Sequence, residues 1–238
     1  MYRMSRFLTL GVLAVGLLGI APATGSAQVV QSLNLSAGLF MPRGEESRIK
    51  NDVWLADVPI FRFDIKDFTG GEVSGEWNFA FGDRVELGVG GAFYQRSVPT
   101  VYRDYVNKDR SEIQSDFKLR LIPAQAVVRF LPFGKPGRFQ PYVGAGLGLV
   151  SWRYSETGDF IDFNDNNNVY RARYVANGST AGPVLLAGFR APLGGDIYAL
   201  TFEGRYQGGE GTLNTNDFLD SKIDLGGTSW RVGFLIRF

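Results

Sequence analysis

From residue 29 onward, apolar and polar residues alternate with a period of two, and no helical period extends over a useful length. Gly, Pro, Asn and Asp bound these alternating stretches, as expected for strands joined by turns. The pattern predicts eight strands, at residues 32–41, 73–81, 84–94, 116–131, 139–152, 180–193, 197–207 and 229–238. In the last of them, the apolar face consists of Trp230, Val232, Phe234, Ile236 and Phe238.

The fourth predicted strand changes phase near Ile122 and Pro123. Its apolar residues occupy odd positions before this point and even positions after it: Phe117, Leu119 and Leu121, then Ala124, Ala126, Val128 and Phe130. A β-bulge would keep all of them on one face, and proline is tolerated at bulges better than at regular ladder positions. We therefore predict a bulge here.

The connections between the predicted strands alternate in length. Three are short, at 82–83, 132–138 and 194–196, and the others are long, at about 42–72, 95–115, 153–179 and 208–228. An even number of strands with short connections at one end and long ones at the other is typical of a closed barrel. The predicted fold is all-β, an eight-stranded antiparallel up-and-down transmembrane β-barrel.

Alternation alone does not decide whether the apolar face points outward. The polar face is rich in glycine, for example at Gly88, Gly90, Gly144, Gly146 and Gly148, which suits the crowded interior of an eight-stranded barrel. Strands of about 9–11 residues match a bilayer core. We therefore predict that the apolar face contacts lipid. The alternative is a soluble, lipocalin-like carrier with the apolar face inside.

The first 27 residues have the pattern of a secretory signal. Arg3 and Arg6 precede an apolar run at 7–20, and small residues lead to Ala27. We predict a cleaved signal peptide at 1–27, with cleavage after Ala23 as the alternative, and a mature barrel at 28–238. We expect such a protein to be exported and, as a barrel that spans a membrane, to lie in an outer membrane.

Composition excludes several kinds of chemistry. The 238-residue chain has 31 glycines, no cysteine and no histidine, so disulfides, thiolates and the commonest general base and metal ligand are missing. A net charge of only +1 disfavours nucleic acid as a partner. We predict no catalytic, cofactor-binding or metal-binding residue, and no enzymatic activity.

Two groups of residues are candidates for function. Acidic and basic residues share the polar face of neighbouring strands, which predicts a salt-bridge network that plugs the lumen and comprises Glu76, Glu86, Lys118, Arg120, Glu203, Arg205 and Arg231. The first long connection is unusually apolar at 53–63. The segment either packs over the barrel mouth or extends strands above the membrane, or else its Trp54 and Phe61 line an entry for an apolar ligand.

Two segments carry a resemblance to a known family. Residues 122–148, with Ile122-Pro123-Ala124, Phe130-Leu131-Pro132 and the run from Gln140 to Gly148, resemble the fourth and fifth strands of OmpW-like and OmpA-like outer-membrane barrels. The final strand, ending in Phe238, resembles the signal that the outer-membrane barrel-assembly machinery reads. The resemblance covers the mature chain as architecture, and we expect a barrel without the peptidoglycan-binding domain of full-length OmpA.

The resemblance implies a function and partners. It implies a structural or envelope-integrity role, with contacts to outer-membrane lipid and lipopolysaccharide and to the assembly machinery. OmpW-like barrels are credited with passage of small hydrophobic molecules, which are therefore expected ligands. Catalytic families on this architecture use a histidine, which this chain lacks. The alternative function is surface recognition or adhesion through the connections at 155–179 and 208–228.

Overall fold

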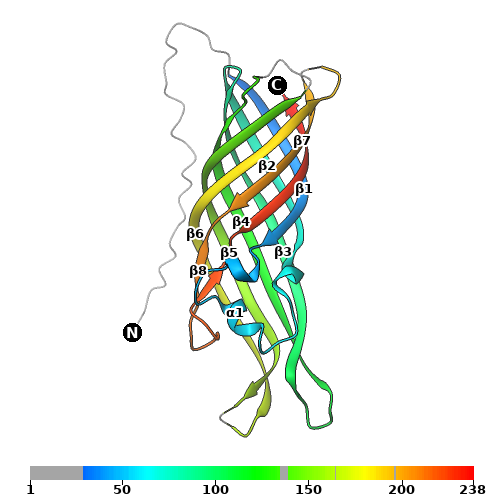
Figure 1. Cartoon of the computed structure of the whole chain (residues 1–238), viewed down its shortest axis with the longest axis vertical. Helices are drawn as coiled ribbons and strands as arrows, with labels where there is room; N and C mark the ends of the chain where they lie inside the picture. Colours follow the sequence, from blue (N-terminus) through cyan, green and yellow to red (C-terminus); the bar gives the residue numbers. More distant parts are fainter. Residues whose placement is uncertain (1–28, 135–138, 164, 196) are drawn as a thin grey trace, which may run out of the picture.

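The computed structural model describes residues 29–134, 139–163, 165–195 and 197–238 and shows a closed antiparallel barrel (Figure 1). The ring order is β1-β10-β7-β6-β5-β4-β3-β2, so each strand pairs with its neighbours in the chain and β1 closes the ring on β10. The predicted eight-stranded fold is confirmed. The strands of the ring are β1 (Val30–Pro42), β2 (Gly70–Phe81), β3 (Val85–Val106), β4 (Glu112–Phe130), β5 (Gln140–Asp162), β6 (Asn168–Pro192), β7 (Tyr198–Gln207) and β10 (Gly227–Arg237).

The predicted signal peptide at 1–27, with its alternative cleavage point, lies outside the described residues. Within the described part of the chain, no helix is long and apolar enough to cross a membrane.

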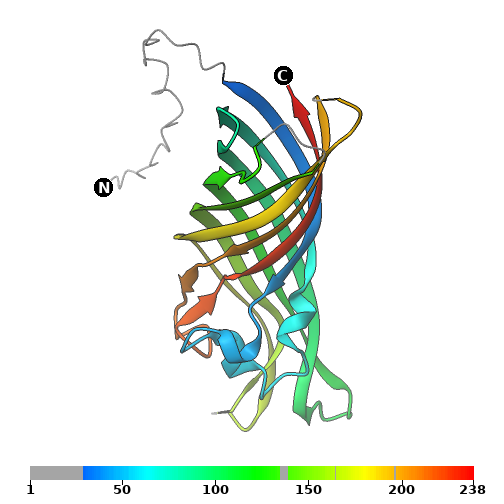
Figure 2. The same ribbon diagram turned by 45° about the horizontal axis from the view of Figure 1, so that its top comes forward.

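Three strands, β3, β5 and β6, are much longer than predicted, and β4 is longer by three residues. β3, β4, β5 and β6 contain 22, 19, 23 and 25 residues, whereas β7 and β10 contain 10 and 11. Most of the connections predicted at 95–115 and 153–179 are therefore strand. The β2–β3 pairing ends at Tyr94 and the β6–β7 pairing begins at Val184. Beyond these residues, β3–β6 continue as a curved four-stranded sheet, which we call the outer sheet (Figures 1 and 2).

The predicted bulge at Pro123 is wrong. The register of β4 with β3 and with β5 is the same on both sides of Pro123, so inward and outward positions alternate without interruption. Leu119 and Leu121 point inward and are 1% exposed, whereas Ile122 points outward and is 42% exposed. The apolar residues change faces because the outer sheet has its hydrophobic core on the inside, whereas the closed ring carries its apolar surface on the outside.

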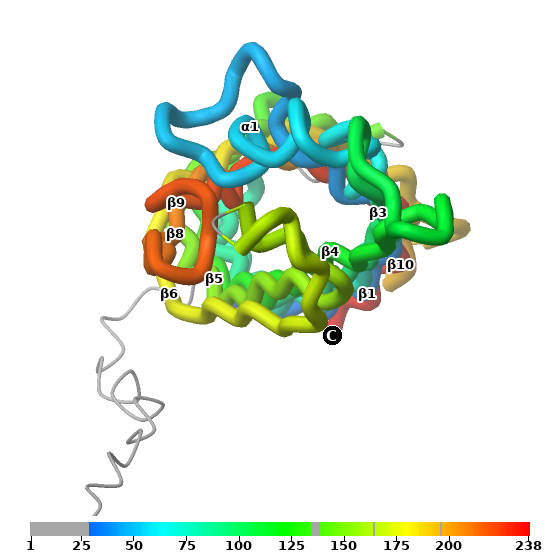
Figure 3. The backbone as a smooth tube through the Cα atoms, turned by 90° about the horizontal axis from the view of Figure 1, so that it is seen from below, coloured from blue at the N-terminus to red at the C-terminus, as the bar shows by residue number. Residues whose placement is uncertain are grey.

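The inner face of the outer sheet is covered by two other parts of the chain. One is the β1–β2 connection, which contains η1 (Glu45–Ser47), α1 (Val53–Asp57) and η2 (Ile65–Phe68). The other is a hairpin of β8 (Glu210–Thr212) and β9 (Lys222–Asp224). Seen along the barrel, α1 and this hairpin lie on two sides of the rim of the mouth (Figure 3).

Local sequence explains the short helices of the β1–β2 connection. The Asp52 carboxylate accepts a hydrogen bond of 2.9 Å from the Trp54 backbone N–H, which caps α1. Asp64 and Asp67 form a reciprocal capping box at the start of η2. Both helices are therefore fixed by carboxylates at their N-termini, and each presents its apolar residues to the outer sheet.

The outside of the closed ring is a continuous apolar band. Apolar side chains at every second position of the strands are 39–70% exposed, among them Val73, Trp77, Val89, Leu147, Trp230 and Val232. A band of this size on an isolated protein needs an apolar partner, such as lipid, to cover it.

Candidate functional site

The centre of the lumen is crossed by buried ion pairs. The Arg129 guanidinium on β4 lies 2.5 Å from the Glu76 carboxylate on β2 and 3.0 Å from the Glu203 carboxylate on β7. Arg205 on β7 lies 2.9 Å from Glu76 and 2.7 Å from Glu203. All four side chains are at most 8% exposed. The network therefore braces three strands that do not adjoin one another in the ring.

Further polar contacts fill the lumen above and below this centre. Arg190 donates to both carboxylate oxygens of Glu86, at 2.8 and 2.6 Å. Arg231 lies 2.5 Å from Glu72. The Gln125 amide bonds Gln207 at 3.1 Å and accepts from Arg205, and Arg129 donates to Asn78 at 2.7 Å. Charge-assisted contacts of this kind satisfy groups that would otherwise be buried without partners.

Glycine leaves the space that the arginines occupy. A Cβ added at Gly88 would lie 2.5 Å from an Arg129 guanidinium nitrogen and 2.9 Å from a Glu76 oxygen. At Gly90, a Cβ would lie 2.7 Å from the Glu76 Cα. The alternating glycines of β3 therefore make room for the network.

The structure places most, but not all, of the predicted network in the lumen. Glu76, Glu86, Glu203, Arg205 and Arg231 point inward and form ion pairs. The prediction places Lys118 and Arg120 with them, and this is wrong. Because no bulge interrupts β4, both side chains point outward; Lys118 is exposed and Arg120 is half-buried.

The predicted network also omits three members. Arg129 and Arg190 lie on the predicted polar face, and no pattern in the sequence indicates which acid each would meet. Glu72 lies one residue before the predicted start of the second strand, and extending its inward series back by two positions from Ser74 finds it. Which acid an arginine meets across the lumen depends on how the ring closes, and not on the pairing of neighbouring strands.

The mouth of the barrel is closed by aromatic packing. The Trp54 ring stacks on Phe68 at 4.0 Å between centroids, and the Arg48 guanidinium lies 4.3 Å from the centroid of the Trp54 ring. Phe61 packs against Tyr102 at 4.5 Å and Phe117 at 5.0 Å. Trp54 and Phe61 are 0% and 3% exposed. Both residues therefore pack over the mouth, which is the first of the predicted alternatives.

The β1–β2 connection and the β8–β9 hairpin together form a cover on the inner face of the outer sheet. Two carboxyl groups are buried between this cover and the sheet, outside the apolar band. Asp57 on α1 and Glu156 on β5 are buried, and neither forms an ion pair within the described residues. Burial, reinforced by the negative charge of Glu156 and Asp52, raises the pKa of Asp57 well above its usual range. Burial raises the pKa of Glu156 to about 7. Both groups therefore bind a proton more readily when they are buried here than they would in water.

Beside the cover, a hollow of about 430 Å³ opens between the outer sheet and the β8–β9 connection. Seven of its fifteen lining residues are aromatic, among them Phe61, Tyr102, Phe160, Tyr174 and Phe218, and the acidic residues Glu156, Asp162 and Asp217 also line it. The aromatic part of the lining suits a small, flat apolar molecule. Phe61 is thus a lining residue as well as part of the cover.

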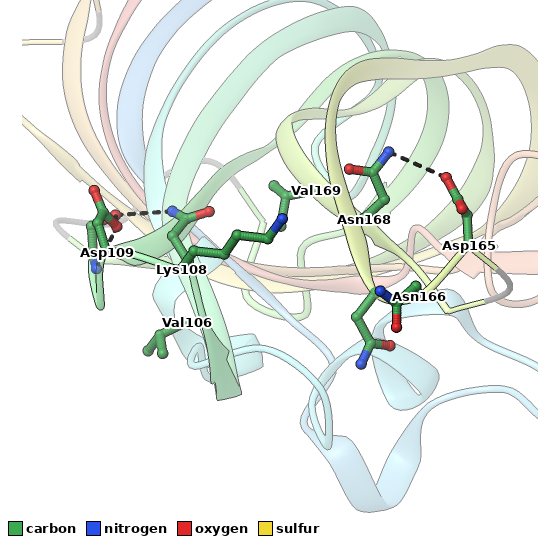
Figure 4. A pocket seen from close by; sticks show the side chains of 10 residues that line it. Val106, Lys108, Asp109, Asp165, Asn166, Asn168 and Val169 are labelled. Atoms are coloured by element: carbon green, nitrogen blue, oxygen red, sulfur yellow. Dashed lines mark hydrogen bonds between the residues drawn. The ribbon is translucent and has the colours of Figure 1, made fainter.

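A second hollow, of about 600 Å³, separates the tips of the β3–β4 and β5–β6 hairpins (Figure 4). Its lining is polar and exposed, with Asn107, Lys108, Asp109, Asn166 and Asn168 among the residues around it. Several of these side chains bond within their own turns, as Asn168 does to Asp165 at 3.4 Å. This hollow is a solvated groove between two turns.

No family model and no curated protein matches this chain. Among solved structures, the outer membrane protein OprG from Pseudomonas aeruginosa matches with a TM-score of 0.52 and 12% identity, over 88% of this chain and 96% of that one. Neisserial surface protein A matches with a TM-score of 0.45 and 15% identity, over 88% and 97%. The N-terminal barrel domain of OprF from Pseudomonas aeruginosa matches with 0.42 and 10%, over 87% and 97%.

The likeness to OprG shows the fold. This chain has the fold of a small, eight-stranded outer-membrane β-barrel, in agreement with the resemblance to OmpW-like and OmpA-like barrels.

Proposed function

We propose that this protein is an outer-membrane barrel with a structural, envelope-supporting role and a lumen closed to axial passage. The observation that carries the proposal is the ion-pair network of Arg129, Arg205, Glu76 and Glu203, which crosses the lumen from β2, β4 and β7. An eight-stranded barrel is just wide enough to be filled by side chains, and here charged side chains fill it. The apolar band supports the membrane location.

Conductance of the reconstituted protein tests the closed lumen. We expect the wild type to show almost no ion current across a planar bilayer. Glu76→Gln with Glu203→Gln leaves Arg129 and Arg205 without charged partners, so we expect rare, anion-preferring openings. The exposed pair Glu45→Gln with Glu46→Gln is the matched control. Large steady currents through the wild type would contradict the proposal.

Cell fractionation tests the location and the role. We expect the protein in the outer-membrane fraction, with gel migration that changes on heating, as for a folded barrel. Loss of the protein should increase sensitivity to detergents and bulky hydrophobic antibiotics. A protein found in the soluble fraction would instead support the carrier alternative.

The aromatic hollow favours a second function, binding of small hydrophobic molecules at the mouth. Since the lumen is filled, such a molecule would move between the hollow and the lipid-facing side of the barrel rather than along its axis. Binding of N-phenyl-1-naphthylamine, measured by fluorescence, tests this. We expect Phe61→Ala and Tyr174→Ala each to weaken binding severalfold, whereas Phe133→Ala, which alters a 78% exposed ring at the opposite end, should not. No binding by the wild type would end this proposal.

A further inference from the structure

A hollow on the outer wall of the barrel is lined by basic side chains. It has a volume of about 170 Å³ and lies where β3, β4, β5 and β6 leave the apolar band. Its lining residues are Gln95, Lys118, Arg120, Arg153, Ser155 and Arg173. Four of these six are basic and none is acidic, so the hollow concentrates positive charge.

The charges of this hollow repel one another. Arg120 and Arg153 are directly opposite in the β4–β5 register, a position where like charges destabilise a sheet. Within the described residues, none of the four basic side chains forms an ion pair. The next outward residue on β4, Asp116, lines a neighbouring hollow instead. A group that brings negative charge from outside would relieve this repulsion.

The position of the hollow indicates where that charge comes from. On the barrel side, the next outward residues of β3 and β4 are apolar: Phe93 and Ile122 are 45% and 42% exposed. On β5, the small Ser151 comes first, and the apolar Leu149, 56% exposed, follows it. The hollow therefore lies at the border between apolar and polar surface. If the apolar band spans the outer membrane, this border meets the headgroups of the outer leaflet, and clusters of basic residues at such a border recognise anionic headgroups.

We propose that this hollow binds a phosphate group carried by an outer-leaflet lipid, as on the phosphorylated glucosamine headgroup of lipopolysaccharide. The inference rests on the proposed function, since it needs the band to lie in the outer membrane. Arg120 and Arg153 are placed to hold the phosphate through planar guanidinium groups, and Lys118 and Arg173 add charge. A lipid fits better than a soluble anion because its acyl chains would cover Phe93 and Ile122 beside the hollow.

Binding of purified lipopolysaccharide to the detergent-solubilised protein tests the site. Lys118→Gln, Arg120→Gln and Arg153→Gln together should weaken binding at least tenfold. The control is Lys50→Gln, Arg84→Gln and Lys108→Gln, which removes the same charge from exposed positions elsewhere and should change affinity less than twofold. Unchanged affinity in the first variant, or equal loss in both, would overturn the proposal.

Two further arms identify the ligand. Lipopolysaccharide stripped of its phosphates should bind the wild type as weakly as the triple variant, and removal of the phosphates should not weaken the triple variant further. Inorganic pyrophosphate, as a soluble probe, should compete poorly. Complete competition by pyrophosphate at concentrations similar to those of the lipid would assign the site to a soluble anion and overturn the lipid assignment.

The melting temperature shows whether a variant loses lipopolysaccharide binding because it is misfolded. In micelles without anionic lipid, Arg153→Gln alone should melt at the same temperature as the wild type or higher, because repulsion with Arg120 is relieved, and it should still weaken lipopolysaccharide binding. Wild-type protein absent from the outer-membrane fraction would overturn the proposed function and this inference together. Protein in that fraction whose variants retain full affinity would overturn the inference alone.

Discussion

At the scale of single residues, the stability of the barrel depends on a few charged side chains in the lumen that are buried away from water. Arg129 is 1% exposed and contacts two carboxylates and an amide. Burying an ion pair brings little net stability, but removing one member leaves an uncompensated charge. The loss of one charged side chain from the network should therefore destabilise the barrel more than the intact network stabilises it.

Arg129→Ala should lower the free energy of unfolding by about 3–5 kcal/mol, because Glu76 and Glu203 lose a shared cation in a buried site. Urea unfolding in micelles, followed by tryptophan fluorescence, measures this. Arg84→Ala, at an exposed turn, is the control and should change stability by less than about 0.5 kcal/mol. A loss as small as that in the control would show that water or a rearranged Arg205 replaces Arg129.

At the scale of elements, the packing of α1 on the outer sheet buries two acids, Asp57 on α1 and Glu156 on β5. The raised pKa of Glu156, about 7 against an ordinary 4.5, means that the covered state binds a proton that the open state releases. The cover is therefore fully favoured below about pH 4.5 and loses stability as the pH rises from there through about 7. Asp57 contributes in the same direction.

Urea unfolding of the wild type at pH 5 and pH 8 should show a less stable cover at pH 8. Glu156→Gln removes one of the two titrating groups and should reduce this dependence, whereas the exposed Glu112→Gln on the neighbouring strand should leave it unchanged. A pH dependence that Glu156→Gln does not alter would show that the cover is governed by other groups.

At the scale of the whole molecule, the barrel consists of two stacked parts with opposite arrangements of apolar residues. The closed ring is apolar outside and charged inside, whereas the outer sheet is apolar inside and charged outside. β4 and β5 pass through both parts in one unbroken register. The level at which the pattern reverses marks the edge of the apolar band.

Because the apolar face changes from the outside of the ring to the inside of the outer sheet, the cost of a new outward charge should depend on its position along a strand. Val128→Arg, within the band, should cost about 2–4 kcal/mol of stability in lipid, whereas Gln114→Arg, at an exposed outward position of the same strand in the outer sheet, should cost about 0–1 kcal/mol. Unfolding in lipid vesicles measures both. Similar costs at the two positions would contradict a membrane location for the band.

The sequence by itself determined most of the strands of the ring and their direction, because period-two alternation is a local property of a pleated chain. The glycines of the opposite face indicated that the apolar face points outward, because small side chains suit a crowded barrel interior. The sequence did not determine the outer sheet, since the reversal at Ile122 has the same local pattern as a bulge. Nor did it determine the partners of Arg129 and Arg190, or the outward position of Lys118 and Arg120. These depend on ring closure and on the packing of Trp54 and Phe61 inside the mouth, which bring together residues distant in the chain.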